Sequence, residues 1–135
     1  SFLSDNRYMI VSTCVFKGNS AGLAGGGYYS LVLNTFTTIQ NAQFVGNTAG
    51  LYGGGMYFGN DHQEVKFLSS DLNGNEAESG AGVYISGFNL IFQFEYCVFK
   101  NNFAHNMGGG LYSLGQLVTL SKSLFHNNTA ALAGG

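Results

Sequence analysis

The chain has 135 residues and a formal net charge of −2, and 9% of its residues are charged while 45% are apolar. Its five Lys and Arg residues form no basic patch, so we expect no nucleic-acid partner, and no apolar run approaches the length of about 18 residues that spans a bilayer. Twelve Phe and eight Tyr residues predict a packed core rather than low-complexity disorder.

One pattern occurs five times along the chain. Each copy begins with a segment in which apolar and polar residues alternate, which predicts a half-buried strand. These segments are MIVSTCVF (9–16), TTIQNAQF (37–44), VKFLSSDL (65–72), FQFEYCVF (92–99) and VTLSKSLF (118–125). Their last residues are Phe16, Phe44, Leu72, Phe99 and Phe125. Three residues further on stand Asn19, Asn47, Asn75, Asn102 and Asn128, at spacings of 28, 28, 27 and 26 residues.

A glycine-rich stretch follows each of the first four asparagines. It contains GGG at 25–27, 53–55 and 108–110, and GAG at 80–82. Glycine adopts positive φ and lets two backbones approach closely, so we expect the chain to bend sharply there. A tyrosine follows each of these stretches, at Tyr29, Tyr57, Tyr84 and Tyr112.

The repeat determines the expected fold. A unit of 25–28 residues with about three short strands cannot bury its apolar face alone, whereas units stacked at roughly 4.8 Å bury it between them. We therefore predict an all-β parallel β-helix (β-solenoid) of about five coils, in a single domain over residues 1–135. The coils are placed approximately at 1–27, 28–55, 56–82, 83–110 and 111–135. Equivalent Phe, Asn and Tyr residues then form ladders, in which stacked asparagine amides can hydrogen-bond to one another.

The Phe-x-x-Asn motif followed by a Gly-Gly-rich stretch resembles the repeats of chlamydial polymorphic outer-membrane proteins and related right-handed β-helix surface proteins. The resemblance covers essentially the whole chain. Leu72 replaces Phe in the third copy, and the family's usual Gly-Gly-Ala-Ile is here Gly-Gly-Gly-x-Tyr. The resemblance implies a right-handed parallel β-helix, a cell-surface or extracellular location and an adhesin-like role, and it implies no active site.

The residues themselves favour no enzyme and no cofactor. The stretch GNSAGLAGGG (18–27) lacks the Gly-Lys-Ser/Thr of a phosphate-binding loop and precedes a strand. Glycosidases and the lyases found among β-helices need carboxylates that share one cleft. Here Asp71 is expected to face outward between Gln43 and Val98, and the remaining acids lie at different positions of the repeat. Threonines do not recur at one position, which disfavours an ice-binding face.

Candidate metal ligands are equally dispersed. The residues Asp61, His62 and Glu64 share one loop and could hold a cation, but a solvated loop is the favoured interpretation. His105 and His126 occupy other positions of the repeat, and no two histidines have ligand spacing. We expect no metal site.

Two further features concern side-chain chemistry. Cys14 and Cys97 occupy the same inward position three coils apart, roughly 14 Å at about 4.8 Å per coil, which is too far for a disulfide. The triplet Asn127-Asn128-Thr129 is a glycosylation sequon, so Asn127 is a candidate site of modification.

The ends of the repeat suggest self-association. A solenoid has two open edges, and this chain lacks the polar capping units that usually block them. Joining residue 135 to residue 1 completes a unit of 26 residues, with Phe2 in the tyrosine ladder. We expect the chain to stack end to end with itself into an extracellular filament. The alternative is that the chain is a window of a longer β-helix.

A binding module is the other class of function that remains open. Tyr52, Tyr96 and Phe103 differ from their repeat partners, and an adhesin that binds cell-surface or glycan partners could use such exposed aromatic residues.

Overall fold

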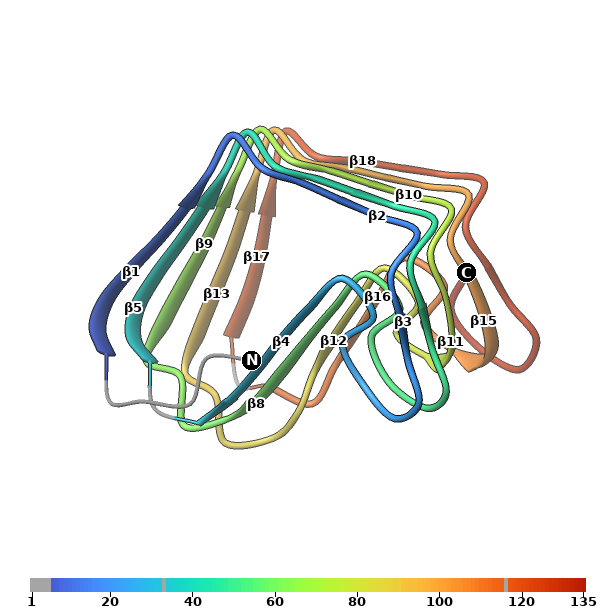
Figure 1. Cartoon of the computed structure of the whole chain (residues 1–135), viewed down its shortest axis with the longest axis horizontal. Helices are drawn as coiled ribbons and strands as arrows, with labels where there is room; N and C mark the ends of the chain where they lie inside the picture. Colours follow the sequence, from blue (N-terminus) through green and yellow to red (C-terminus); the bar gives the residue numbers. More distant parts are fainter. Residues whose placement is uncertain (1–5, 33, 116) are drawn as a thin grey trace.

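The computed structural model describes residues 6–32, 34–115 and 117–135, and every regular element in these ranges is a β-strand. Each strand pairs in parallel with its counterpart one coil further along the chain, which confirms the expected parallel β-solenoid (Figure 1). The described ranges contain no helix of the length and apolarity needed to cross a membrane.

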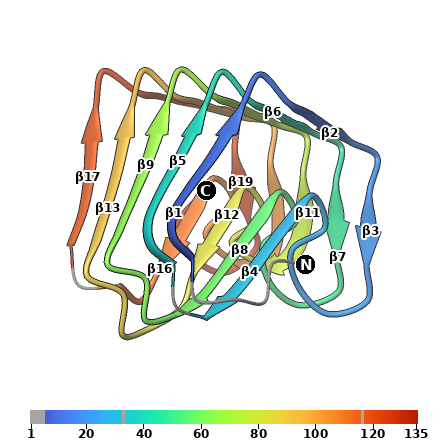
Figure 2. The ribbon, with the colours of Figure 1, turned by 60° about the vertical axis from the view of Figure 1, so that its left-hand side comes forward.

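The first sheet contains the first part of each alternating segment, and Figure 2 shows its strands side by side. Its strands are β1 (Asn6–Ser12), β5 (Asn34–Gln40), β9 (Glu64–Leu68), β13 (Ile91–Glu95) and β17 (Leu117–Ser121). Ile39, Phe67 and Phe94 point into the core and are at most 1% exposed, because alternate side chains of a strand face opposite sides.

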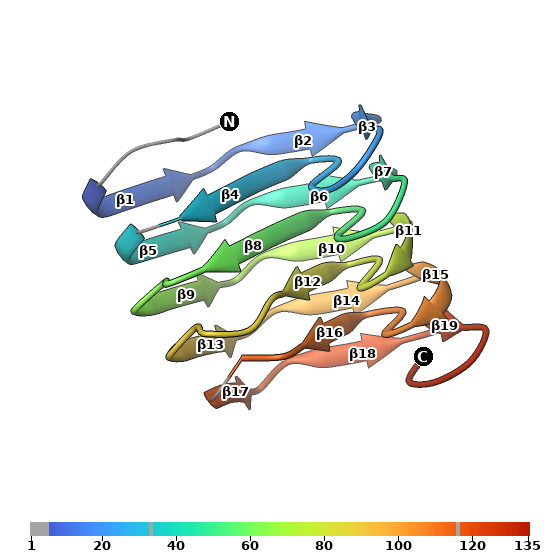
Figure 3. The same cartoon turned by 90° about the horizontal axis from the view of Figure 1, so that it is seen from below.

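The second sheet contains the Phe residues of the motif. Its strands are β2 (Val15–Lys17), β6 (Gln43–Val45), β10 (Asp71–Asn73), β14 (Val98–Lys100) and β18 (Leu124–His126). Figure 3 shows these strands side by side from β2 to β18. Only two residues, a turn residue and one more, connect each first-sheet strand to the second-sheet strand that follows it. The chain therefore changes direction within each predicted segment. The turn residue has positive φ in every coil, at Thr13, Asn41, Ser69, Tyr96 and Lys122.

The third sheet is the shortest. Its strands are β3 (Ser20–Ala21), β7 (Thr48–Ala49), β11 (Glu76–Ser79), β15 (Phe103–Met107) and β19 (Thr129–Ala130). The fourth sheet follows the glycines and consists of β4 (Tyr28–Val32), β8 (Met56–Asn60), β12 (Val83–Ile85) and β16 (Leu111–Ser113).

Each of the first four coils therefore has four strands and the last described coil has three, so the expectation of about three strands per coil is too low. Two-residue strands such as Thr48–Ala49 are too short for an alternating pattern to reveal them in the sequence. Among the described residues, three sheets have five strands and the fourth has four. The chain thus completes about four turns, whereas about five coils are expected from the sequence.

The core fills the space between the four sheets. Phe44, Phe58, Phe92 and Phe99 are fully buried there, together with smaller apolar side chains from every sheet. Phe58 contacts Phe92 edge-on, at a centroid distance of 5.2 Å, so residues of the fourth and first sheets meet across the coil. Aromatic packing of this kind supplies a large part of the burial energy in small domains.

Glycine is required where the coil turns into the fourth sheet. Gly53 has a φ of 63°, and a Cβ atom there would collide with the carbonyl group of Met56. A Cβ on Gly55 would approach Asn75 to 3.2 Å, so this segment passes directly over the asparagine ladder. The absence of a side chain thus allows the coil to close at this corner.

The proposed continuation of the repeat through residue 1 places Phe2 in the tyrosine ladder. Phe2 lies outside the described residues.

Candidate functional site

The five repeated asparagines form a continuous ladder along one corner of the solenoid. Asn47, Asn75 and Asn102 are at most 1% exposed. The Oδ1 atom of Asn75 accepts hydrogen bonds from the backbone N–H and from Nδ2 of Asn47, at 3.0 and 3.1 Å. Its Nδ2 atom donates to Asn102 Oδ1 and to the carbonyl oxygen of Phe44, at 2.9 and 3.0 Å. All hydrogen-bonding positions of the buried amide are therefore used.

The ladder has a direction. At every step the asparagine of one coil donates from its backbone N–H and Nδ2 to Oδ1 of the next coil. Asn128 is the last member, and it donates through Nδ2 to the carbonyl oxygen of Phe99. Asn19 is the first member, and no described residue donates to its Oδ1. One edge of the ladder thus offers donors and the other an acceptor.

The Phe and Tyr residues of the repeat also stand in register. Phe16 and Phe44 stack at a centroid distance of 4.7 Å, and Phe99 and Phe125 stack at 4.4 Å. Leu72 lies between Phe44 and Phe99 in the paired strands. Tyr29, Tyr57, Tyr84 and Tyr112 stack in the fourth sheet at 5.2 to 5.6 Å.

The last coil exposes side chains that are buried in the central coils. Phe125 is 38% exposed, whereas Phe44, Leu72 and Phe99 at the same position are 0% exposed. Leu120 is 48% exposed, although its counterpart Phe94 is buried. The difference arises because no further coil covers this edge within the described residues.

The carboxylates of the described residues do not meet in one cleft. Asp71 lies between Gln43 and Val98 as expected, and its Oδ2 atom is 3.1 Å from the ammonium group of Lys100. Glu64 pairs with Lys66 at 2.9 Å on the same strand. The described residues contain no group of three potential metal ligands.

The expectation that the loop with Asp61, His62 and Glu64 is solvated is wrong for His62. Its side chain is fully buried, in edge contact with Phe58 and Phe92 at centroid distances of 5.4 and 6.5 Å. The loop is held because Asn89 Oδ1 accepts the backbone N–H of His62 at 2.9 Å. Burial lowers the pKa of His62 to about 4, so this imidazole is neutral at neutral pH. The neighbouring Asp61 is exposed.

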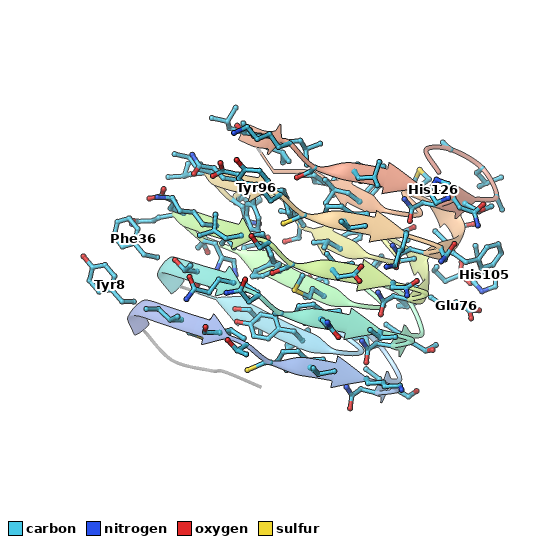
Figure 4. All side chains as sticks on the ribbon, turned by 90° about the horizontal axis from the view of Figure 1, so that it is seen from above. Tyr8, Phe36, Glu76, Tyr96, His105 and His126 are labelled. Carbon is cyan, nitrogen blue, oxygen red and sulfur yellow. The ribbon has the colours of Figure 1, made fainter. Side chains whose placement is uncertain are left out.

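The remaining histidines, His105 and His126, are exposed on the surface. His105 Nε2 is 2.8 Å from Glu76 Oε1, and the two side chains lie together in Figure 4, where His126 projects separately. His126 is exposed on β18, opposite Lys100 of the neighbouring strand. A pair of one carboxylate and one imidazole lacks the further ligands of a structural metal site.

Both cysteines are free, and Cys97 is buried. Burial raises the pKa of the Cys97 thiol. Asn127 is exposed at a turn with a φ of 51°, and its Nδ2 donates to Asn101 Oδ1 at 2.9 Å. Glycosylation at Asn127 remains a prediction.

A groove runs between the third-sheet strands and the tyrosines of the fourth sheet, with a volume of about 420 Å³. We call it the tyrosine groove, and define it by the residues Tyr52, Glu78, Tyr84, Asn106, Met107 and Tyr112. Tyr52 is 38% exposed and lies 4.6 Å from the ring of Tyr84. Asn106 Nδ2 donates to Glu78 Oε2 at 2.8 Å.

The polar wall of this groove depends on an irregularity that the sequence analysis missed. Ala77 pairs with Ala104 and Ser79 pairs with Met107, so Glu78 alone faces two residues of β15. His105 and Asn106 both lie opposite Glu78, and Asn106 is the one that hydrogen-bonds to its carboxylate. The sequence carries the signal, because Ala77 and Gly80 are three residues apart whereas the equivalent pair is four apart in the other copies.

Other exposed aromatic side chains lie away from the groove. Tyr8 and Phe36 stack at 5.2 Å and project together from the first sheet (Figure 4). Tyr96 is 52% exposed, and its hydroxyl accepts a hydrogen bond from Lys122 at 2.7 Å. Phe103 contacts His105 edge-on at 4.9 Å. Of the three aromatic residues singled out by the repeat, only Tyr52 lines the tyrosine groove.

The fold and the ladders define a repeat protein of the parallel β-solenoid class. A family model described as the Chlamydia polymorphic membrane protein repeat matches residues 96–114. This segment contains Phe99, Asn102, the glycines 108–110 and Tyr112. The resemblance read from the sequence is therefore confirmed over this repeat. No curated protein and no solved structure matches the chain.

Proposed function

We propose that this chain is a non-enzymatic structural β-solenoid of a cell surface or extracellular filament, in which successive copies stack head to tail. The observation that carries the proposal is the exposed Phe125, whose counterparts in the central coils are completely buried. An uncovered coil edge of this kind is a template for another strand layer.

A second copy offers a matching surface because the two edges differ in chemistry. Asn128 has the backbone N–H and Nδ2 that every internal asparagine donates to the next coil, and Asn19 has the Oδ1 acceptor. In such a contact, Phe125 of one copy would stack on Phe16 of the next, as equivalent Phe residues stack within the chain. Contacts between unlike edges form a heterologous interface, which extends into a filament when the rotation does not close.

The proposed location rests on the matched family model, whose description names a membrane protein of Chlamydia. A non-enzymatic role is supported by the scattered carboxylates, of which Asp71 and Glu64 are held in separate ion pairs. A glycoside hydrolase needs two such groups directed at one substrate.

Sedimentation velocity over a range of protein concentrations tests the stacking. Asn19→Ala removes the acceptor from one edge while the backbone N–H of residue 19 still donates to Asn47. Loss of two interfacial hydrogen bonds is expected to weaken association by about tenfold or more. Asn19→Asp keeps an acceptor and should restore association, and Asn101→Gly is the control on an outward position. The proposal fails if the chain remains monomeric at high concentration.

Binding of a ligand on the lateral surface is the second candidate function. The tyrosine groove favours it, because the groove combines exposed aromatic rings with a carboxylate and an amide.

A further inference from the structure

Tyr52 gives the tyrosine groove an aromatic surface that the repeat does not require. Ala24 occupies the equivalent position one coil earlier and Ser79 one coil later, and both pair with Tyr52. A small side chain is thus sufficient for the fold at this position. Tyr52 instead leans over the tyrosine ladder, with its ring centre 4.6 Å from Tyr84 and 6.3 Å from Tyr57.

The tyrosines bring hydroxyl groups as well as rings. Burial raises the pKa of Tyr84, and the neighbouring phenols of Tyr52, Tyr112 and Tyr57 raise it further. The Tyr84 phenol therefore stays protonated at neutral pH and can both donate and accept hydrogen bonds. Rings from successive coils repeat along the solenoid axis every 5.2 to 5.6 Å.

The opposite wall supplies an acceptor and a donor. Glu78 is half-buried, and Asn106 binds one of its oxygens, so the other oxygen is held in a fixed direction with acceptor capacity. Among the residues that the structure describes, no Lys, Arg or His lines the groove. This composition disfavours phosphate, sulfate and carboxylate groups, which need a cationic partner.

We propose that the tyrosine groove binds a neutral, β-linked hexose polymer that lies along the solenoid axis. The C–H faces of the sugars pack on Tyr52 and on the ring edges of the stacked ladder tyrosines, and Glu78 and Asn106 bind pairs of sugar hydroxyls. An extended β-linked chain advances by close to one coil spacing per sugar, so successive tyrosines of the ladder can contact successive sugars, while Tyr52, Glu78 and Asn106 act at one place along the chain. The volume of about 420 Å³ lies within the range of about 300–1,000 Å³ typical of ligand sites.

The groove deepens the second candidate function and is independent of head-to-tail stacking. Glycan binding is measured on dilute protein, so it can fail while the filament proposal stands, and the reverse also holds.

Isothermal titration with cellohexaose and fully N-acetylated chitohexaose, both neutral, tests the proposal, with tyrosine fluorescence as a second readout. At least one hexamer should bind, and more tightly than its monosaccharide, because a hexamer spans several coils. Tyr52→Ala, which introduces the residue found at position 24, and Glu78→Gln should each raise Kd by about tenfold. Tyr96→Ala changes a more exposed tyrosine that lies outside the groove and should leave Kd unchanged.

Circular dichroism spectra of the variants establish whether the fold is kept. If Tyr52→Ala does not fold, Glu78→Gln still tests the groove, because glutamine has the same shape as glutamate. The proposal is overturned if neither hexamer binds, if both groove variants bind like the parent chain, or if a heparin fragment binds more tightly than the neutral hexamers.

Discussion

Replacement of Asn75 by alanine should be the most damaging single change to the asparagine ladder. The substitution leaves the backbone N–H and one Nδ2 hydrogen of Asn47 without their acceptor, and it removes the donor to the carbonyl oxygen of Phe44. These groups are buried, and each unsatisfied buried group costs about 1–3 kcal/mol. Two to three such groups give an expected loss of about 3–6 kcal/mol, which is a large part of the stability of a typical domain.

Urea unfolding followed by circular dichroism measures this loss as a fall in the unfolding midpoint at constant slope. Asn19→Ala is the matched control, because Asn19 is exposed and its loss leaves only one acceptor position of Asn47 unused. Its expected cost is about 1 kcal/mol. The reasoning would be refuted if Asn75→Ala cost no more than Asn19→Ala.

Three further predictions concern the corner, the buried histidine and the thiols. Gly53→Asn should destabilise the fold by several times more than Gly46→Asn in urea unfolding, since both have positive φ but only Gly53 has backbone where a Cβ would lie. Burial lowers the pKa of His62 to about 4 in the folded protein, so as the pH falls this histidine takes up a proton in the unfolded chain before it does so in the folded one. Stability should thus fall by about 3 kcal/mol between pH 6.5 and 4, and His62→Leu should lose this dependence, whereas an unchanged slope would contradict it. A thiol reagent should label Cys14 in the native protein and the buried Cys97 only on unfolding; equal rates would be the opposite result.

Most of the register could be predicted from the sequence. In a solenoid the neighbour of a residue is found by adding one repeat length, so the pairing of Phe44 with Phe16 and Leu72 follows from the spacing alone. The same arithmetic places Asp71 between Gln43 and Val98, as observed. Burial of the Phe positions follows from the alternation of side chains along each strand.

The features that escaped prediction depend on contacts within a coil rather than between coils. His62 lies in a polar stretch, and its burial results from the packing of Phe58 and Phe92 around it, which no repeat partner indicates. The tyrosine groove requires the irregular pairing of Glu78, which is visible only when the length of one copy is compared segment by segment.

The stacking of coils in register is the central claim, and a pair of spin labels measures it directly. Cys14→Ser and Cys97→Ser give a background without native thiols, because Ser70 and Ser123 occupy the same ladder position. Labels then replace Ser20 and Thr129, which are exposed and stand at equivalent positions at the two ends of the third sheet.

Four coil spacings of about 4.8 Å separate these two positions, so pulsed double electron–electron resonance should give a narrow distance distribution centred near roughly 19 Å. The pair at Ser20 and Phe103 should be shorter by one spacing. A broad distribution, or a distance for Thr129 that does not exceed that for Phe103, would contradict the β-solenoid account.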